Sequence, residues 1–193
     1  MSGLRLSAPE LAATSDVAAA RELLTRWSPP SPEQAAARGR IVAFIDEHPD
    51  DAHLRTCVPG HLTASALLLD HTGRRVLLTH HAKLRRWLQL GGHCDGDANL
   101  AACALRECVE ESGIEDLTID PAPIDVDVHP IPAHGTDPEH LHLDVRFVVR
   151  APAGARETCS HESLELRWFD RDELEVLDLD DSVRRLFRHI RTH

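Results

Sequence analysis

The sequence has 193 residues, of which 42% are hydrophobic, and its formal net charge at pH 7 is −11. This length and apolar content suffice for one domain with a sizeable core, and they argue against a disordered chain. The acidic balance argues against a nucleic acid as partner, because affinity for a polyphosphate backbone comes mainly from a basic surface.

The chain shows no membrane or secretion signal. Its first ten residues contain no apolar signal region, and no apolar run approaches the roughly 20 residues of a membrane span. The cysteines are odd in number and contain no C-x-x-C pair, so we expect reduced thiols in a cytoplasmic protein without a membrane partner. They are Cys57, Cys94, Cys103, Cys108 and Cys159.

The first ~55 residues have the pattern of two amphipathic helices. The first runs from Asp16 to Trp27, and a proline-rich break at 28–32 separates it from a second helix over Glu33 to Glu47, which Pro49 ends. We expect residues 1–56 to form a helical extension packed on the domain formed by residues 57–193. Such helices could cap the fold or make the contact of a homodimer.

The pattern changes from helix to strand at Gly60. The apolar run His61 to Leu69 and the segment Arg75 to Thr79 flank a turn at 70–73, which predicts a hairpin buried on both faces. A basic stretch follows and ends at Trp87, which we expect to pack in the core. Its cations are candidate contacts for substrate phosphates, with a solvated turn as the alternative; they are Lys83, Arg85 and Arg86.

A glycine pair followed by an acidic helix is the most informative stretch. At about 100° per residue, three glutamates share one helical face, whereas four apolar residues share the other. Like charges at this spacing destabilise a helix by roughly 0.2–0.5 kcal/mol per pair, so the triplet requires a reason. A hard divalent cation is one, and a solvated acidic face is the alternative. The glutamates are Glu107, Glu110 and Glu111, opposite Ala101, Leu105, Cys108 and Val109.

The spacing in this stretch resembles the signature of the Nudix hydrolase family, G-x5-E-x7-R-E-U-x-E-E-x-G-U, in which U is aliphatic. The matching residues are Gly92, Arg106, Glu107, Cys108, Glu110, Glu111, Gly113 and Ile114. The departure is Ala98, which stands where the signature has a glutamate. The neighbouring Asp97 could replace that carboxylate if the loop were shifted, but we interpret it as the N-cap of the helix.

The resemblance implies an α/β fold of the α+β type, in which a mixed sheet lies between helices, here with the added N-terminal helical pair. It implies that Glu107, Glu110 and Glu111 bind Mg²⁺ or Mn²⁺ and that Arg106 orients a glutamate. It also assigns the substrate loop to Gly91, Gly92 and His93. The implied reaction is metal-dependent hydrolysis of a diphosphate linkage in a small phosphoanhydride of the nucleoside-diphosphate type.

Two further strands follow, over Ala122 to Val128 and over Leu141 to Val149. The odd positions of the second are apolar, so its even positions, His140, His142, Asp144 and Arg146, are predicted to line a cleft. The first three could form a second metal site, since imidazole suits transition metals. The alternative is substrate binding or general-base catalysis by His142 or Glu139. Glu162 is a further candidate for a glutamate outside the signature.

The remainder predicts a strand over Ser163 to Asp170, a short helix at Glu173 and Leu174, and an amphipathic helix over Asp181 to Ile190. Two other functions stay open. The glycine loop loosely resembles that of isopentenyl-diphosphate isomerases, although the chain contains no tyrosine. Alternatively, the lost carboxylate at Ala98 fits a ligand-binding regulator without catalysis. The intact R-E and E-E pairs favour hydrolysis.

Overall fold

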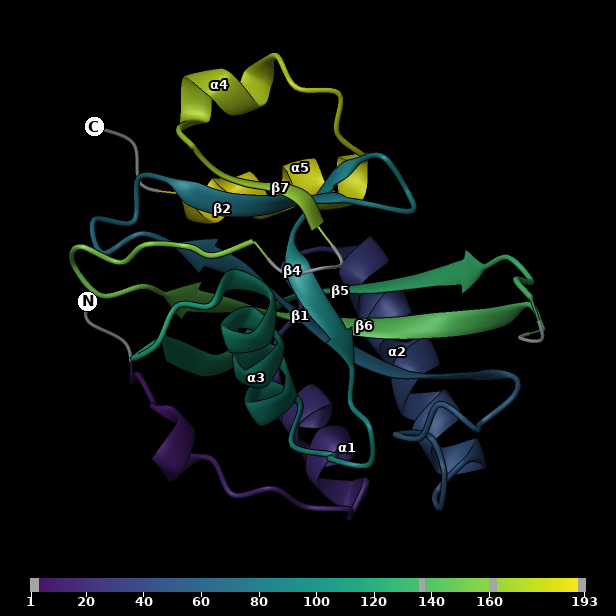
Figure 1. Ribbon diagram of the computed structural model, residues 1–193. Helices are drawn as coiled ribbons and strands as arrows, with labels where there is room; N and C mark the ends of the chain where they lie inside the picture. The colour runs from purple at the N-terminus through teal and green to yellow at the C-terminus, as the bar shows by residue number, and fades with distance from the viewer. Residues whose placement is uncertain (1–3, 136–137, 160–162, 191–193) are drawn as a thin grey trace.

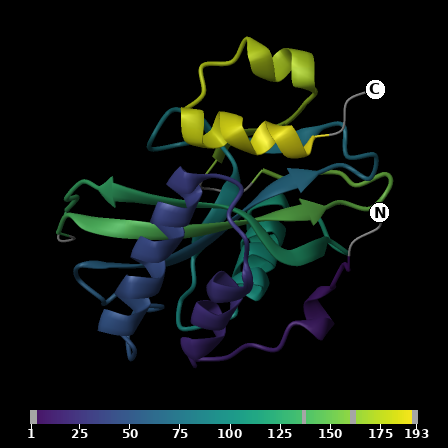
Figure 2. The same cartoon turned by 180° about the vertical axis from the view of Figure 1, so that it is seen from behind.

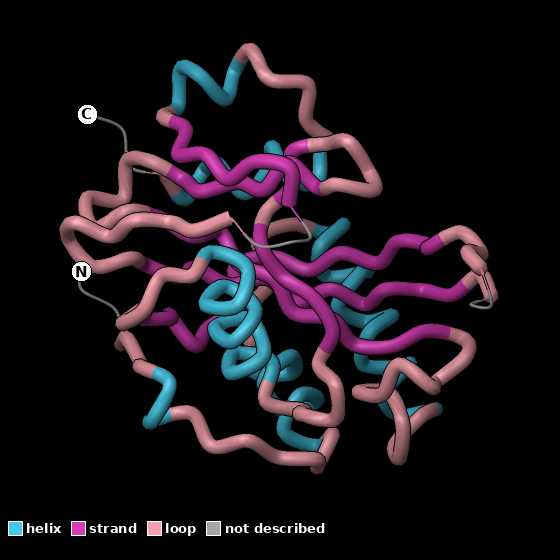
Figure 3. Tube along the Cα trace, viewed as in Figure 1, coloured by secondary structure: helices cyan, strands magenta, loops and turns pink. Residues whose placement is uncertain are grey.

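The computed structural model describes residues 4–135, 138–159 and 163–190. A mixed sheet of seven strands forms the centre of the molecule, with helices around it (Figure 1, Figure 3). The strands are β1 (Gly60–Leu69), β2 (Val76–His81), β3 (Trp87–Leu88), β4 (Leu90–His93), β5 (Thr118–Ile131), β6 (His140–Arg150) and β7 (Ser163–Phe169). The helices are η1 (Ala8–Glu10), α1 (Ala18–Arg26), α2 (Pro32–Glu47), α3 (Leu100–Ser112), α4 (Arg171–Glu175), α5 (Asp181–Arg184) and η2 (Arg185–His189).

Strand β1 is the centre of the sheet. The order is β3-β2-β1-β6-β5, with β4 also paired to β1 and β7 to β2. β1 runs parallel to β6 and antiparallel to β2 and β4. Every residue of β1 is buried, and Leu68 and Leu69 pair with β2, which confirms the predicted hairpin. A strand with neighbours on both sides and elements on both faces needs the nearly continuous apolar run that its sequence shows.

Strand alternation gives the sheet two separate cores. Alternate residues of β1 and β6, including Leu62 and Phe147, pack in one core with residues of α1, α2 and α3. On the opposite face, Leu67 and Val148 pack in a second core with the C-terminal residues Val183 and others of α5 and η2. Helices therefore cover both faces of the sheet, as expected from the sequence.

The N-terminal helices pack on this same sheet. Helix α2 lies beside β5, as Figure 2 shows from behind, and the Gln34 amide binds both the N–H and the carbonyl of Val126 at 2.8 and 3.0 Å. Ile41 and Ile45 complete the contact within the first core. Helix α2 therefore packs on this face of the sheet. Among the described residues, no helix combines the length and apolarity that crossing a membrane requires.

The start of α3 corrects one prediction. Asn99, and not Asp97, is the N-cap, because its side chain accepts the N–H of Ala102 at 3.3 Å. At the other end, Gly113 stops the helix in the left-handed conformation, with φ of 65°. The predicted C-terminal helix also differs in part, since it begins as α5 and tightens into the 3-10 helix η2 at Arg185.

Candidate active site

A cavity of about 540 Å³ lies between α3, β4 and the polar face of β1, β5 and β6. Its size is in the range of pockets that hold small-molecule ligands. It collects most of the residues expected from the signature segment and the strand that follows. These are Lys83, Gly91, Gly92, His93, Glu107, Glu110, Glu111 and His142.

The three signature glutamates differ in their surroundings. The Glu107 carboxylate is largely buried and accepts a 2.9 Å hydrogen bond from Arg106, whereas Glu110 is exposed, 3.7 Å from the same guanidinium. Burial raises the pKa of Glu107, and the bond from Arg106 opposes that rise. Glu111 accepts the Gly91 N–H at 3.3 Å. Oxygen donors at these three positions are the ligand type that Mg²⁺ and Mn²⁺ prefer.

The two loop glycines are required because neighbouring groups lie too close to them to leave room for a Cβ atom. A Cβ atom on Gly91 would lie 2.2 Å from the Cβ of Ser65 on β1, and a Cβ on Gly92 would lie 2.4 Å from Oε2 of Glu107. Strand β4 therefore packs against its neighbour and α3 with no room for side chains. Gly92 leaves the space beside the loop that the Glu107 carboxylate occupies, and Gly91 lets β4 lie against β1.

Ala98, which stands where the signature has a glutamate, contacts the N-terminal segment. Ala98 is fully buried, and its N–H donates to the carbonyl of Thr14 at 2.5 Å. The Asp97 carboxylate accepts the N–H groups of Thr14 and Asn99 at 3.0 and 2.9 Å, and it does not line the cavity. Asp97 therefore fastens the loop to the N-terminal segment. Without a glutamate at position 98, Arg106 bonds to Glu107 and to the carbonyl of His93, at 2.7 Å.

The basic stretch splits into one cavity residue and two others. Lys83 lines the cavity, as does Leu84 beside it. Arg85 adopts a positive φ of 56° in the turn, and Arg86 pairs with Asp180 at 3.0 Å; neither lines the cavity. Trp87 packs edge-on against Phe169 at 4.9 Å, as expected for a core residue. Of the three predicted phosphate contacts, the structure brings only Lys83 to the glutamates.

Polar residues on one face of the sheet meet in rows across three strands. His61 of β1 stands beside His142 of β6, which stands beside His129 of β5. Two positions along each strand, the next row is Thr63, Asp144 and Asp127, and the third is Ser65, Arg146 and Asp125. The period of two places all nine on one face, and the register sets which side chains touch.

In the third row and its surroundings, every charge has partners. Arg146, only 2% exposed, bonds to Asp144 at 2.8 Å and Asp125 at 3.3 Å, and donates to the Ser182 carbonyl at 2.8 Å. Arg185 of η2 binds Asp125 through Nε at 2.9 Å. Of the four even positions of β6 that were predicted to line a cleft, His142 and Asp144 border the cavity, whereas Arg146 is buried under the C-terminal helices and His140 is not among the lining residues.

The first row is a cluster of imidazoles. The ring centroids of His61, His140 and His142 lie 4.9 to 5.2 Å apart, and His93 is 5.0 Å from His61. Burial and the neighbouring histidines lower the pKa of His142 to about 2. Asp144 is not part of this cluster, because its carboxylate accepts hydrogen bonds from Thr63, Ser65 and Arg146. The predicted trio with Asp144 is therefore wrong, and His61 takes its place.

The glutamates proposed outside the signature receive no support. Glu139 is exposed and does not line the cavity, and Glu162 falls outside the described residues. The carboxylates that line the cavity beyond α3 are instead Asp95 and Asp144, within the described part of the chain. Asp95 forms a two-point pair with Arg55 at 2.5 and 2.9 Å, and that hydrogen bonding lowers its pKa.

Sequence reasoning missed several cavity residues that a strand pattern could have revealed. The run His61, Thr63 and Ser65 alternates with apolar residues inside β1, and β5 repeats this alternation up to His129. Because most residues of β1 are apolar, the alternation of its polar residues was not recognised in the sequence. The missed lining residues are Arg55, Thr63, Ser65, Thr79, His81, Leu84, Leu88, Gln89, Asp95, His129 and Ile131.

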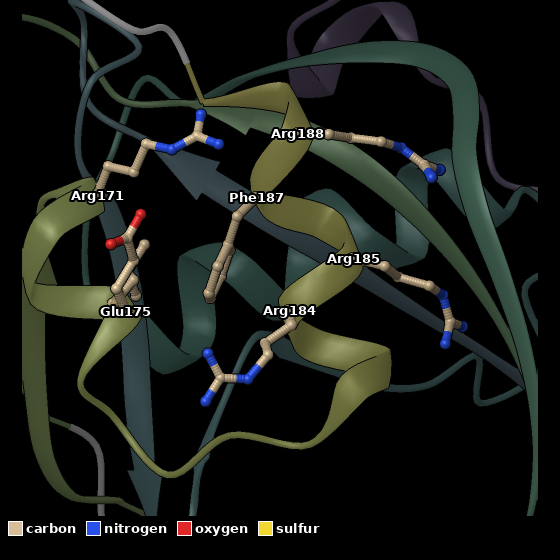
Figure 4. Close-up of a pocket in the computed structure, with 7 residues that line it drawn as sticks. Arg171, Glu175, Arg184, Arg185, Phe187 and Arg188 are labelled. Atoms are coloured by element: carbon tan, nitrogen blue, oxygen red, sulfur yellow. The ribbon is translucent and has the colours of Figure 1, made fainter.

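A second hollow of about 430 Å³ lies between α4 and η2. Figure 4 shows Arg171 and Glu175 on one side of Phe187, whereas Arg185 and Arg188 extend away from Glu175. Arg184 is bonded to the carbonyl of Leu177, and Glu175 is the single carboxylate of the lining. This hollow offers no convergent set of catalytic groups.

Comparison with known proteins identifies the family. A family model described as NUDIX domain matches residues 59–190. A search of curated protein sequences finds no significant match. Among solved structures, a NUDIX family hydrolase from Clostridium perfringens has 19% identity and a TM-score of 0.53, covering 67% of this chain and 95% of that one.

Two further structures share the fold. An Ap4A hydrolase from C. elegans in a binary complex has 20% identity and a TM-score of 0.53, covering 66% of this chain and 93% of that one. The dihydroneopterin triphosphate pyrophosphohydrolase of E. coli has 17% identity and a TM-score of 0.50, covering 67% and 94%. These likenesses establish the fold, and the domain match confirms the resemblance seen in the signature. The chain belongs to the NUDIX domain family.

Proposed function

We propose that this protein is a pyrophosphohydrolase that cleaves a diphosphate linkage in a small molecule with the help of Mg²⁺ or Mn²⁺. Membership of the NUDIX family and the hydrolases that share the fold support this class of reaction. The observation that carries the proposal is the meeting of Glu107, Glu110 and Glu111 with Lys83 in one cavity.

The carboxylates fit a hard divalent cation. Three side chains from adjacent helical turns line one cavity, and the hydrogen bond from Arg106 favours the charged form of the largely buried Glu107. When bound to these oxygens, the ion would lower the pKa of a water molecule and neutralise charge on the phosphates. In this proposal Glu107, Glu110 and Glu111 are the metal ligands, and Arg106 orients Glu107.

The residues around the glutamates would bind and orient the anionic substrate. Lys83 would pair with a phosphate oxygen, since ammonium groups bind phosphate as point charges. Gly92 lets the substrate approach the backbone of the loop, where His93 is the adjacent side chain. The described lining contains no phenylalanine, tryptophan or tyrosine, so recognition of a nucleobase would depend on imidazole rings and on Leu84, Leu88 and Ile131.

The two alternatives fare less well. An isomerase of the isopentenyl-diphosphate type uses a cysteine, but no cysteine lines the cavity among the described residues, and Cys94 is fully buried. A hydrogen bond with Cys103 and burial raise the pKa of the Cys94 thiol. A regulator without catalysis would not require the three carboxylates. All five cysteines are free, which suits a reducing compartment, and we place the protein in the cytoplasm.

A hydrolysis screen in which the products are separated by chromatography tests the proposal, because cleavage of a diphosphate that carries a group at each end yields two phosphomonoesters and no free phosphate. The panel contains nucleoside-diphosphate sugars, dinucleoside polyphosphates, nucleoside triphosphates and coenzymes, each with Mg²⁺ and with Mn²⁺. We expect turnover of at least one diphosphate compound and none of simple phosphomonoesters. A blank across the panel, from a folded protein that still binds a nucleotide, would favour the regulatory function instead.

A further inference from the structure

Two histidines of the cluster on the sheet, His61 and His142, have ring nitrogens without hydrogen-bond partners. His61 is only 3% exposed, yet neither of its ring nitrogens has a partner at good hydrogen-bond geometry, and the backbone of Cys57 is the polar group that interacts with the ring. Nε2 of His142 is also buried without a partner. Buried donors and acceptors are paired in the great majority of cases, so each exception calls for an unseen partner.

The geometry indicates what that partner is. One nitrogen from each of His61, His140 and His142 lies within 4.8 Å of the other two. Zinc–nitrogen bonds of about 2.0–2.1 Å in a tetrahedron require nitrogens about 3.3 Å apart, so the side chains would rotate toward one another when an ion binds. The parallel register of β1 and β6 places His61 directly beside His142, on strands that hold the backbone rigid.

The protonation states also fit a metal ligand set. Nδ1 of His140 lies 2.9 Å from the carbonyl oxygen of Pro138, so Nδ1 donates and Nε2 keeps its lone pair. Nδ1 of His129 donates in the same way to Asp127 at 2.9 Å, beside the cluster.

We propose that His61, His140 and His142 bind one late first-row transition-metal ion, with Zn²⁺ the expected occupant. Imidazole nitrogens select such ions, whereas the glutamates of α3 offer only oxygen. Three protein ligands leave a coordination position for water or an anionic oxygen. Since His142 also lines the cavity, the ion lies beside the substrate, separate from the Mg²⁺ or Mn²⁺ of the proposed function.

The test uses untagged, full-length protein, because a histidine tag would bind the same ions. The protein is stripped with EDTA and titrated with Zn²⁺ by calorimetry and with Co²⁺ by visible absorption. We expect one Zn²⁺ per chain and the intense absorption of tetrahedral Co²⁺. His140 is half-buried and is the first residue of β6, so the fold should tolerate its replacement. In His140→Ala we expect about 100-fold weaker Zn²⁺ binding or more. His61→Gln should show the same loss.

Two controls separate this site from others. His48→Ala alters a second group that could hold an ion, His48, Asp51 and Cys57, and Glu111→Gln alters the α3 carboxylates. Both should keep the tight Zn²⁺ site. No stoichiometric Zn²⁺ in the wild type, unchanged binding in the folded His140→Ala, or a loss in His48→Ala would overturn the proposal. Since the readout is metal binding, it stands or falls separately from hydrolysis.

Discussion

The two ends of the polar sheet face are built from the same strands but treat their polar groups in opposite ways. At one end, Arg146 and Asp125 are buried and bonded to each other, and Asp125 also accepts a hydrogen bond from Arg185. At the other end, His61 is buried and His142 is half-buried, and both ring nitrogens of His61 and Nε2 of His142 have no partner. A saturated network fixes the structure, whereas unsatisfied groups at a cavity wall are available to a ligand. Within three rows of one sheet, the paired charges therefore stabilise the fold, and the unpaired ring nitrogens are the candidates for binding a ligand.

The largest expected effect comes from breaking the saturated end. Arg146→Met leaves the buried carboxylates of Asp125 and Asp144 without their shared cation. Removing one partner of a buried ion pair costs about 3–5 kcal/mol, so urea unfolding should show a loss of that size. Arg167→Met, which removes a half-exposed pair with Glu173, is the matched control and should cost at most about 1 kcal/mol. Equal losses in the two variants would mean that the buried network is no more important than a surface pair.

A smaller, pH-dependent effect is expected at Asp127, which joins the two ends. Burial alone would raise its pKa, but the bond from His129 and the charges of Arg146 and Arg185 outweigh burial and lower it. A carboxylate with a lowered folded pKa stabilises the fold above its unfolded pKa, and this contribution disappears as the pH falls through the folded value. Each unit of lowering is worth about 1.4 kcal/mol.

The variant Asp127→Asn should therefore be less stable than the wild type at pH 7, and the difference should shrink as the pH falls below about 4. Denaturant unfolding at a series of pH values measures it. A stability difference that stays constant over this range would show that the Asp127 charge does not contribute.

The smallest effect is expected at the unsatisfied end, where its sign is the informative quantity. His61→Leu removes a buried ring without hydrogen bonds and replaces it with an apolar group. In EDTA, the free energy of unfolding should stay within about 1 kcal/mol of the wild type or rise, because no hydrogen bond is lost. With Zn²⁺ present, the wild type should gain stability and the variant should not. A loss of several kcal/mol in EDTA would mean that His61 is already satisfied within the fold.

The local features of the site could be predicted from the sequence, and the long-range ones could not. The helix with Glu107, Glu110 and Glu111 follows from spacing and a glycine stop, which act within a few turns. The partnership of His61 with His142 depends on the parallel register of β1 and β6, strands about 80 positions apart. No local pattern sets that register. The separation of Lys83 from Arg85 and Arg86 depends likewise on a turn and on the distant Asp180.

The error at the start of α3 has a similar origin. Both Asp97 and Asn99 are good N-cap residues, so composition does not choose between them. The choice is made by the N-terminal segment, whose Thr14 binds the Asp97 carboxylate and thereby leaves Asn99 to cap the helix. An extension more than 80 residues away in the chain thus determines the geometry of the signature loop.

The most direct test of the proposed function compares the glutamates of α3 with the histidine cluster in one assay. Steady-state hydrolysis of the best substrate is measured against Mg²⁺ concentration for the wild type, Glu111→Gln and His140→Ala. Glu111→Gln should lower kcat by about 10²–10³-fold, as the loss of one preorganised electrostatic group does elsewhere. Its unfolding free energy should be unchanged or higher by about 0.2–0.5 kcal/mol, since repulsion with Glu107 is relieved. His140→Ala should keep the Mg²⁺ dependence of the wild type. Full activity in Glu111→Gln, or a Mg²⁺ response abolished in His140→Ala alone, would contradict the assignment of catalysis to the glutamates of α3.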